Sequence, residues 1–75
     1  EIYLKPASDY VRLGREVSFS TLVESARRRG EIAIGYRLQR HATAKEHSYG
    51  VKTNPPKSAR VTLGEQDALI VLAES

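Results

Sequence analysis

The chain has 75 residues, of which 40% are hydrophobic and 28% are charged, and its formal net charge is +3 at pH 7. This mixture is typical of one small globular domain and excludes a disordered or fibrous chain. The sequence has no cysteine, so no disulfide or thiolate metal cluster can add to its stability, and a reducing cytoplasm is favoured. Because so short a chain is marginally stable alone, we expect self-association to help it.

The longest uninterrupted apolar run, residues 68–73, is far shorter than the roughly 20 residues of a helix that spans a bilayer. We therefore expect no direct insertion into a membrane. The chain begins at Glu1, contains no methionine and shows no pattern of an export signal. These features predict a domain excised from a longer protein, whose other segments would carry any targeting or transmembrane signal.

The N-terminal residues predict a half-buried strand. Apolar and polar side chains alternate over residues 2–5, with Ile2 and Leu4 on one side, and Pro6 ends the run. A turn at Gly14 then precedes a second, short extended piece.

Residues 18–30 show the strongest helical pattern in the chain. Apolar side chains recur at spacing i, i+3, i+4 and i+7 and so share one face: Phe19, Leu22, Val23 and Ala26. Ser18 is well placed as the N-cap, and Gly30 lies just past the expected C-terminus. The pattern predicts a helix that lays one apolar stripe on a flat partner.

Residues 31–40 predict that partner, a strand whose core-facing side chains would be Ile32, Ile34, Tyr36 and Leu38. The opposite face begins with Ala33 and Gly35, which are small enough to let another backbone or surface approach. A polar stretch, residues 41–48, follows before the alternation resumes at Tyr49. We therefore expect a hairpin with a mobile loop, in which both tyrosines of the strands point toward the core.

The C-terminal segment predicts a short strand at residues 61–63, a turn at residues 64–67 and a final strand that is apolar on both faces. Such a strand is normally central in a sheet or covered on both sides. Since one helix covers only one side of a sheet, we expect a second copy or a neighbouring domain to cover the other. The predicted fold class is α+β: a small, mostly antiparallel sheet of four to five strands with one helix packed on one face.

No group of residues in the sequence predicts catalysis, and we expect no enzymatic activity. The chain has no cysteine nucleophile, and its carboxylates are dispersed. His41 and His47 are six positions apart in a loop, a spacing that fits neither a helical ligand pair nor a zinc site, so no metal is expected. The five glycines are too far apart for a phosphate-binding loop.

A small basic nucleic-acid-binding module is the alternative prediction. The basic residues are scattered, and their one cluster, Arg27–Arg29, follows the predicted helix, where positive charge also complements the helix dipole. In this alternative, the cluster would bind phosphates together with Arg37 and Arg40.

Two stretches resemble the regulatory domains called RCK C-terminal or TrkA-C. The first stretch has the family's order of an apolar residue, glycine, a basic residue, a helix and a strand, and it is residues 11–37, VRLGREVSFSTLVESARRRGEIAIGYR. TNPPKSARVTLGEQDALIVLAES, residues 53–75, resembles the family's closing strand, proline, turn and final apolar strand, although its turn departs from the usual Glu-Gly-Asp. The Asn-Pro pair at 54–55 and the Ala-Glu pair at 73–74 look closer to CASTOR- and POLLUX-type ion channels and their bacterial relatives.

This resemblance implies a single regulatory domain over residues 1–75, on the cytoplasmic face of a cation (potassium) channel or transporter. Such modules commonly form homodimers or pack on a neighbouring RCK-type domain, and some bind a small regulatory ligand, such as a cyclic dinucleotide, between subunits. The family's cleft would correspond to Ile34, Arg37, Asn54 and Pro55. With this function, the segment needs no cofactor of its own and does not bind nucleic acid.

Overall fold

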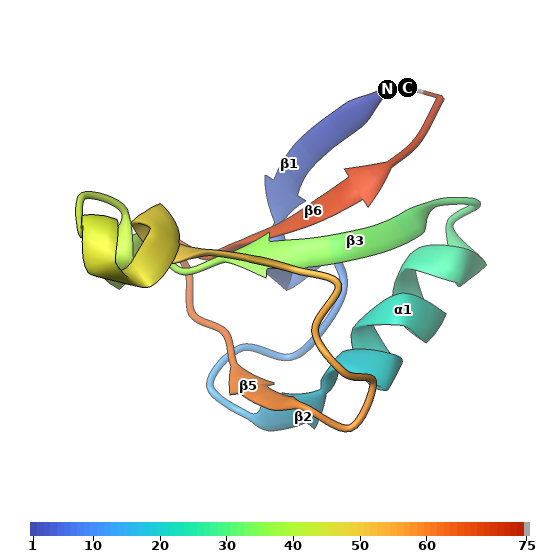
Figure 1. Ribbon diagram of the computed structural model, residues 1–75. Coiled ribbons are helices and arrows are strands. Elements are labelled where there is room, and N and C mark those ends of the chain that lie inside the picture. The colour runs from blue at the N-terminus through green and yellow to red at the C-terminus, as the bar shows by residue number, and fades with distance from the viewer. Residues whose placement is uncertain (75) are drawn as a thin grey trace.

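The computed structural model describes residues 1–74 (Figure 1). Along the chain its elements are β1 (Ile2–Pro6), the 3-10 turn η1 (Ala7–Asp9), β2 (Glu16–Ser18), α1 (Phe19–Arg28), β3 (Ile32–Arg37), the 3-10 turns η2 (Gln39–His41) and η3 (Lys45–Gly50), β4 (Val51–Thr53), β5 (Arg60–Thr62) and β6 (Ala68–Leu72). The predicted α+β class is confirmed.

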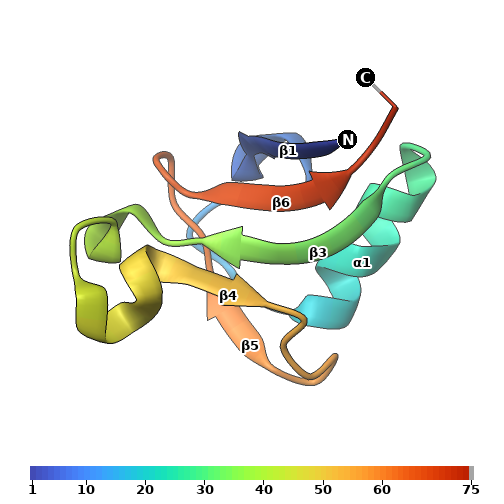
Figure 2. The same ribbon diagram turned by 45° about the horizontal axis from the view of Figure 1, so that its top comes forward.

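Four strands form one antiparallel sheet in the order β1-β6-β3-β4, and α1 lies across one face of it (Figure 2). The last strand, β6, is central in this sheet, as its apolar character on both faces predicts. β2 and β5 pair with each other in a separate antiparallel ladder below the sheet, which the sequence did not indicate.

The helix has the predicted ends and the predicted buried face. Ser18 stands at the N-cap with extended backbone, and Gly30, just beyond the C-cap Arg29, has the positive φ of +75° that ends many helices. Phe19, Leu22 and Ala26 are buried against the sheet. The helix therefore holds one face of β3 and β6 in place.

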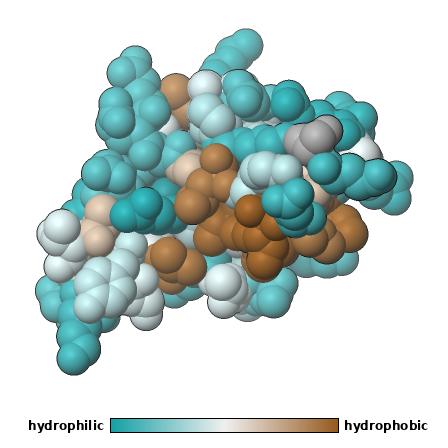
Figure 3. Space-filling view, turned by 90° about the horizontal axis from the view of Figure 1, so that it is seen from above, coloured by the Kyte–Doolittle hydropathy of each residue, from teal (hydrophilic) through white to brown (hydrophobic). Residues whose placement is uncertain are grey.

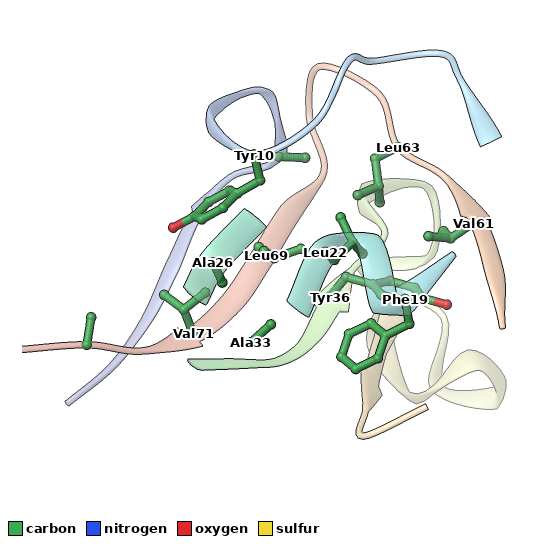
Figure 4. Packing of buried hydrophobic residues seen from close by; sticks show 12 residues of the cluster. Tyr10, Phe19, Leu22, Ala26, Ala33, Tyr36, Val61, Leu63, Leu69 and Val71 are labelled. Carbon is green, nitrogen blue, oxygen red and sulfur yellow. The ribbon is translucent and has the colours of Figure 1, made fainter. Parts of the chain in front are cut away.

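The core lies between α1 and the inner face of the four-stranded sheet, and the β2–β5 ladder closes one end of it (Figure 4). Its largest fully buried side chains are Leu22, Leu63, Leu69 and Val71. Leu69 and Val71 come from alternate positions of β6, so both point to the helix side. Burial of each such side chain contributes about 1.5–3 kcal/mol to folding.

β3 does not alternate as predicted. Between Ala33 and Gly35 its register against β6 shifts by one residue, so Ile34 is an extra residue, a β-bulge. The bulge puts both Ala33 and Tyr36 in the core and leaves Ile32 exposed on the other side. The prediction that Ile32 faces the core and Ala33 faces away is therefore wrong, because a bulge changes which side of the sheet an alternating pattern faces.

The predicted hairpin of β3 and β4 is confirmed, and its long connection is folded into η2 and η3. A Cβ at Gly35 would lie 1.9 Å from the Lys52 carbonyl oxygen, so the backbone that approaches this small residue is that of β4. Tyr49 is 51% exposed, and its predicted core position is wrong. The reason is that Ser48 and Tyr49 adopt left-handed backbone conformations, which place Tyr49 outside the alternation of β4.

No helix within residues 1–74 is both long enough and apolar enough to cross a membrane. The two ends of the described chain lie side by side, where the Ala73 amide donates to the Glu1 carbonyl at 2.9 Å.

Candidate interface on the outer face of the sheet

Aliphatic side chains gather on the outer face of the four-stranded sheet, the face opposite α1. In β1, Ile2 and Leu4 are 67% and 57% exposed, and they pair across the sheet with Leu72 and Ile70 of β6. Ile32 of β3 pairs with Leu72 from the other side and is 62% exposed. We call these five residues the outer apolar patch, in which Ile70 is buried and the other four are exposed. Figure 3 shows hydrophobic residues gathered on this face.

The patch follows from the sequence of its strands. β1 does alternate as predicted, but Tyr3 packs against the core while Ile2 and Leu4 face outward. β6 is apolar on both faces, so Leu69 lies in the core and Leu72, which is 41% exposed, lies in the patch. Exposed apolar side chains gathered on one face mark interaction surfaces more often than isolated ones do.

The four residues predicted to line a ligand cleft all belong to the β3–β4 hairpin or the turn after it. The Asn54 amide donates a 2.7 Å hydrogen bond to the Ile34 carbonyl oxygen, so the structure brings these two residues together at one end of the hairpin. Asn54 is exposed with φ +45°, and the neighbouring Pro55 is buried.

Arg37 lies at the other end of β3, where it pairs with Val51 and Ala68. Arg37 is three positions from Ile34 along the strand, which corresponds to roughly 10 Å. Arg37 shares the outer face with the apolar patch, because its partner Ala68 is two residues from Ile70 on the same side of β6. A role for these four residues in ligand binding stays a prediction.

The sequence is 35% identical over 74 residues to a segment of Ion channel CASTOR from Lotus japonicus. The alignment covers 99% of this chain but 8% of that protein, so the chain spans about 8% of the length of the curated relative that it matches. No family model matches the sequence. The chain is therefore related to CASTOR-type channels, which confirms that part of the predicted resemblance.

The arginines of the alternative, nucleic-acid-binding function do not form one free basic surface. Arg27 and Arg28 lie 3.6 and 3.9 Å from the Glu24 carboxylate, and Arg29 lies 3.7 Å from that of Glu31. This cluster precedes β3, whereas Arg37 ends it, and a strand of that length separates the two sites by roughly 20 Å. These positions do not favour the alternative.

A buried ionic cluster around Glu31 was not predicted from the sequence. Lys5 Nζ lies 2.6 Å from one carboxylate oxygen, and the Tyr10 hydroxyl donates to the other at 2.6 Å. The hydrogen bond from Lys5, followed by that from Tyr10, lowers the pKa of Glu31. The available signal was a charged residue directly between the helix-ending Gly30 and an apolar strand. This cluster joins β1, the segment after η1 and the junction of α1 and β3, so its expected role is to stabilise the fold.

His41 and His47, which the sequence placed in a loop, stack on each other with ring centroids 3.9 Å apart and planes 17° apart. Within residues 1–74, no three His, Cys, Asp or Glu side chains are grouped so that they could hold a metal ion.

Proposed function

We propose that this chain is a cytoplasmic regulatory module of a cation channel, which works as a pair of copies joined through the outer apolar patch. The observation that carries the proposal is the set of exposed aliphatic side chains on the sheet face opposite α1, which are those of Ile2, Leu4, Ile32 and Leu72. The relation to Ion channel CASTOR supports it. A neighbouring RCK-type domain of the parent protein is the second possible cover for the same face. The proposed module is not an enzyme.

A second copy suits the patch because a two-fold interface needs a surface that is complementary to itself. The centre of the patch is aliphatic on three adjacent strands, so two copies would bury like against like without unpaired charge. Each Ile or Leu side chain that becomes fully buried contributes about 1.5–3 kcal/mol before the entropy cost of association is subtracted. Arg37 lies beside the apolar centre, at the polar rim of such an interface.

Regulation would come from a ligand that binds one arrangement of the paired modules more tightly than another. Only such a difference in affinity can shift the equilibrium between closed and open channel. A small phosphate-containing regulator, such as a cyclic dinucleotide, would contact Ile34, Arg37, Asn54 and Pro55 of the two copies. The exposed Asn54 and the outward side of Arg37 support this placement, since amide and guanidinium groups both donate to phosphate oxygens.

Sedimentation of the 75-residue chain tests the interface. We expect self-association that Ile32→Glu weakens by at least about tenfold, because a carboxylate would be buried in an apolar contact. The matched control is Tyr49→Glu, which changes another exposed hydrophobic side chain to the same charge away from the patch. Circular dichroism would show that both variants fold. A wild-type chain that stays monomeric at high concentration, with or without nucleotide, would contradict the proposal.

A further inference from the structure

A hollow with several polar side chains lies between the β3–β4 hairpin and the turns η2 and η3, away from the outer apolar patch. It is a hollow of about 250 Å³ lined by Tyr36, Leu38, His41, His47, Ser48, Gly50, Val51 and Lys52. None of the four residues predicted for the family's cleft lines it. Because one copy of the chain forms the whole hollow, its use does not depend on the proposed function.

The walls of the hollow are fixed by the backbone. The Leu38 amide donates to the Gly50 carbonyl at 2.9 Å, and a Cβ at Gly50 would lie 2.2 Å from the Leu38 carbonyl oxygen, so the hairpin is tightly closed there. Ser48, Tyr49 and Gly50 have successive positive φ angles of 52°, 57° and 81°, which reverse the chain after His47. This reversal comes directly after His47, whose imidazole stacks on that of His41.

Lys52 of β4 is among the residues that line the hollow. It is the cross-strand partner of Tyr36, so both side chains lie on the same side of the hairpin. Burial raises the pKa of Tyr36, so its hydroxyl keeps its proton and can donate a hydrogen bond. The polar lining therefore consists of an ammonium, a phenol, a serine hydroxyl and two imidazoles, and no carboxylate is among the lining residues.

The charges around the stacked imidazoles affect the pKa of His41. Two protonated rings 3.9 Å apart would repel each other, and burial together with His47 and Arg40 lowers the pKa of His41. Glu46 of η3 acts in the opposite direction. The Asp67 carboxylate nearby accepts hydrogen bonds from the amides of Gln39 and Gly64.

We propose that this hollow binds the phosphate group of a small molecule, with Lys52 and the imidazole pair as its donors. Phosphate oxygens accept hydrogen bonds from each of these groups, and ammonium and imidazolium also neutralise its charge. The hollow is smaller than the roughly 300–1,000 Å³ of sites that enclose drug-sized ligands, so it suits a phosphate whose remaining atoms extend outward. A free phosphate ion and a nucleotide are the two sources of this chemistry.

Binding should take up a proton. A bound anion beside the imidazole favours the protonated form of His41, so the pKa of His41 is higher in the complex than in the free chain. The complex then binds more protons, and its affinity increases as the pH falls from about 8 toward 6 and below. If the pKa difference is one unit, the gain approaches about tenfold.

Titrations followed by the NMR resonances of the two histidines test the site with three probes: sulfate, adenosine 5′-monophosphate and adenosine. Sulfate keeps its charge throughout this pH range, so its pH dependence reports on the protein. We expect saturable shifts with both anions and none with adenosine. A markedly tighter monophosphate indicates a nucleotide as the natural ligand, and equal affinities indicate a free anion. Saturable binding of adenosine, or no saturation by either anion, would overturn the proposal.

Matched lysine variants separate this hollow from general attraction to a basic chain. Lys52→Ala should weaken sulfate binding at least about tenfold, as expected for loss of one charge-assisted hydrogen bond. Lys57→Ala removes the same charge from the exposed turn before β5 and should leave the affinity unchanged. His41→Gln should abolish most of the pH dependence, because His41 is the group whose pKa rises on binding. An equal loss in the two lysine variants, or an affinity independent of pH in the wild-type chain, would overturn the assigned donors.

Discussion

The Tyr10 hydroxyl donates a 2.6 Å hydrogen bond to Oε1 of Glu31, across 21 positions of sequence. The other carboxylate oxygen lies 2.6 Å from Lys5 Nζ, so both oxygens of this 7%-exposed residue have donors. A carboxylate can stay ionised at so buried a place because these donors replace the water that it loses. The cluster therefore fastens β1 and the segment after η1 to the junction of α1 and β3.

Removal of the Tyr10 hydroxyl should destabilise the fold. Tyr10→Phe keeps the buried ring but takes one donor from a buried carboxylate, at a cost of about 1–3 kcal/mol. Urea denaturation would measure the loss in the free energy of unfolding. Tyr49→Phe is the matched control, since that tyrosine is 51% exposed, and it should change stability little. Equal effects of the two substitutions would show that the hydrogen bond contributes nothing.

The Glu31 cluster should also make stability depend on acid pH. The hydrogen bond from Lys5 lowers the folded-state pKa of Glu31 from its ordinary 4.5, so the unfolded chain binds this proton more readily. The stabilisation is therefore present above pH 4.5 and is lost as the pH falls through the folded-state pKa. Glu31→Gln lacks this contribution, so the stability gap between it and the wild-type chain should narrow below pH 4.5.

Urea midpoints measured from neutral pH to about pH 3 would show this narrowing. Glu65→Gln, in the exposed turn before β6, controls for the general effect of removing one negative charge. Since the other carboxylates titrate in both proteins, the difference between variants is the informative quantity. A gap between wild type and Glu31→Gln that stays constant over the whole range would contradict a role for this carboxylate.

The helix and the central strand could be predicted because each rests on a local pattern. The spacing from Phe19 to Ala26 fixes one helical face, and Gly30 marks the place where the chain must leave the helix. β6 is apolar at every position, and a central strand is the place where such a segment is shielded best. Neither inference requires knowledge of distant contacts.

The sides of β1 and β3 could not be predicted with the same certainty. Alternation shows that Ile2 and Leu4 share a face, but not whether that face meets the core or the surroundings. In β3, Ile32, Ala33 and Ile34 are all apolar, so the pattern does not reveal where a bulge reverses the alternation. For the same reason, the sequence predicts a sheet face that needs a cover but does not identify the residues that lie on it.

The close approach of β4 to Gly35 makes a sharp prediction about the hairpin. Gly35→Ala should destabilise the chain by roughly 1–3 kcal/mol, because the added methyl group would lie 1.9 Å from the Lys52 carbonyl oxygen unless the strands separate. Gly64→Ala is the matched control: its φ is not positive, and the nearest atom to the new methyl group, Asp67 Oδ2, is 3.8 Å away. Thermal unfolding should show a lower Tm for the first variant and little change for the second.

The two faces of β6 should respond differently to the same truncation. Leu69 is fully buried on the helix side, so Leu69→Ala should lower the free energy of unfolding by about 2–5 kcal/mol. Leu72 is 41% exposed on the outer face and should cost much less in a dilute, monomeric chain. Urea denaturation at low protein concentration would measure both values.

Leu72→Ala, which costs little stability in the monomer, should have a clear effect on self-association at high protein concentration. If the outer apolar patch joins two copies, Leu72→Ala removes an apolar contact from each side, so the loss is counted twice in a symmetric dimer. We expect sedimentation to show weaker self-association for this variant even though its monomer is nearly as stable as the wild-type chain. Self-association unchanged in Leu72→Ala would mean that the copies meet elsewhere, and the exposed face of β6 would then serve a different partner.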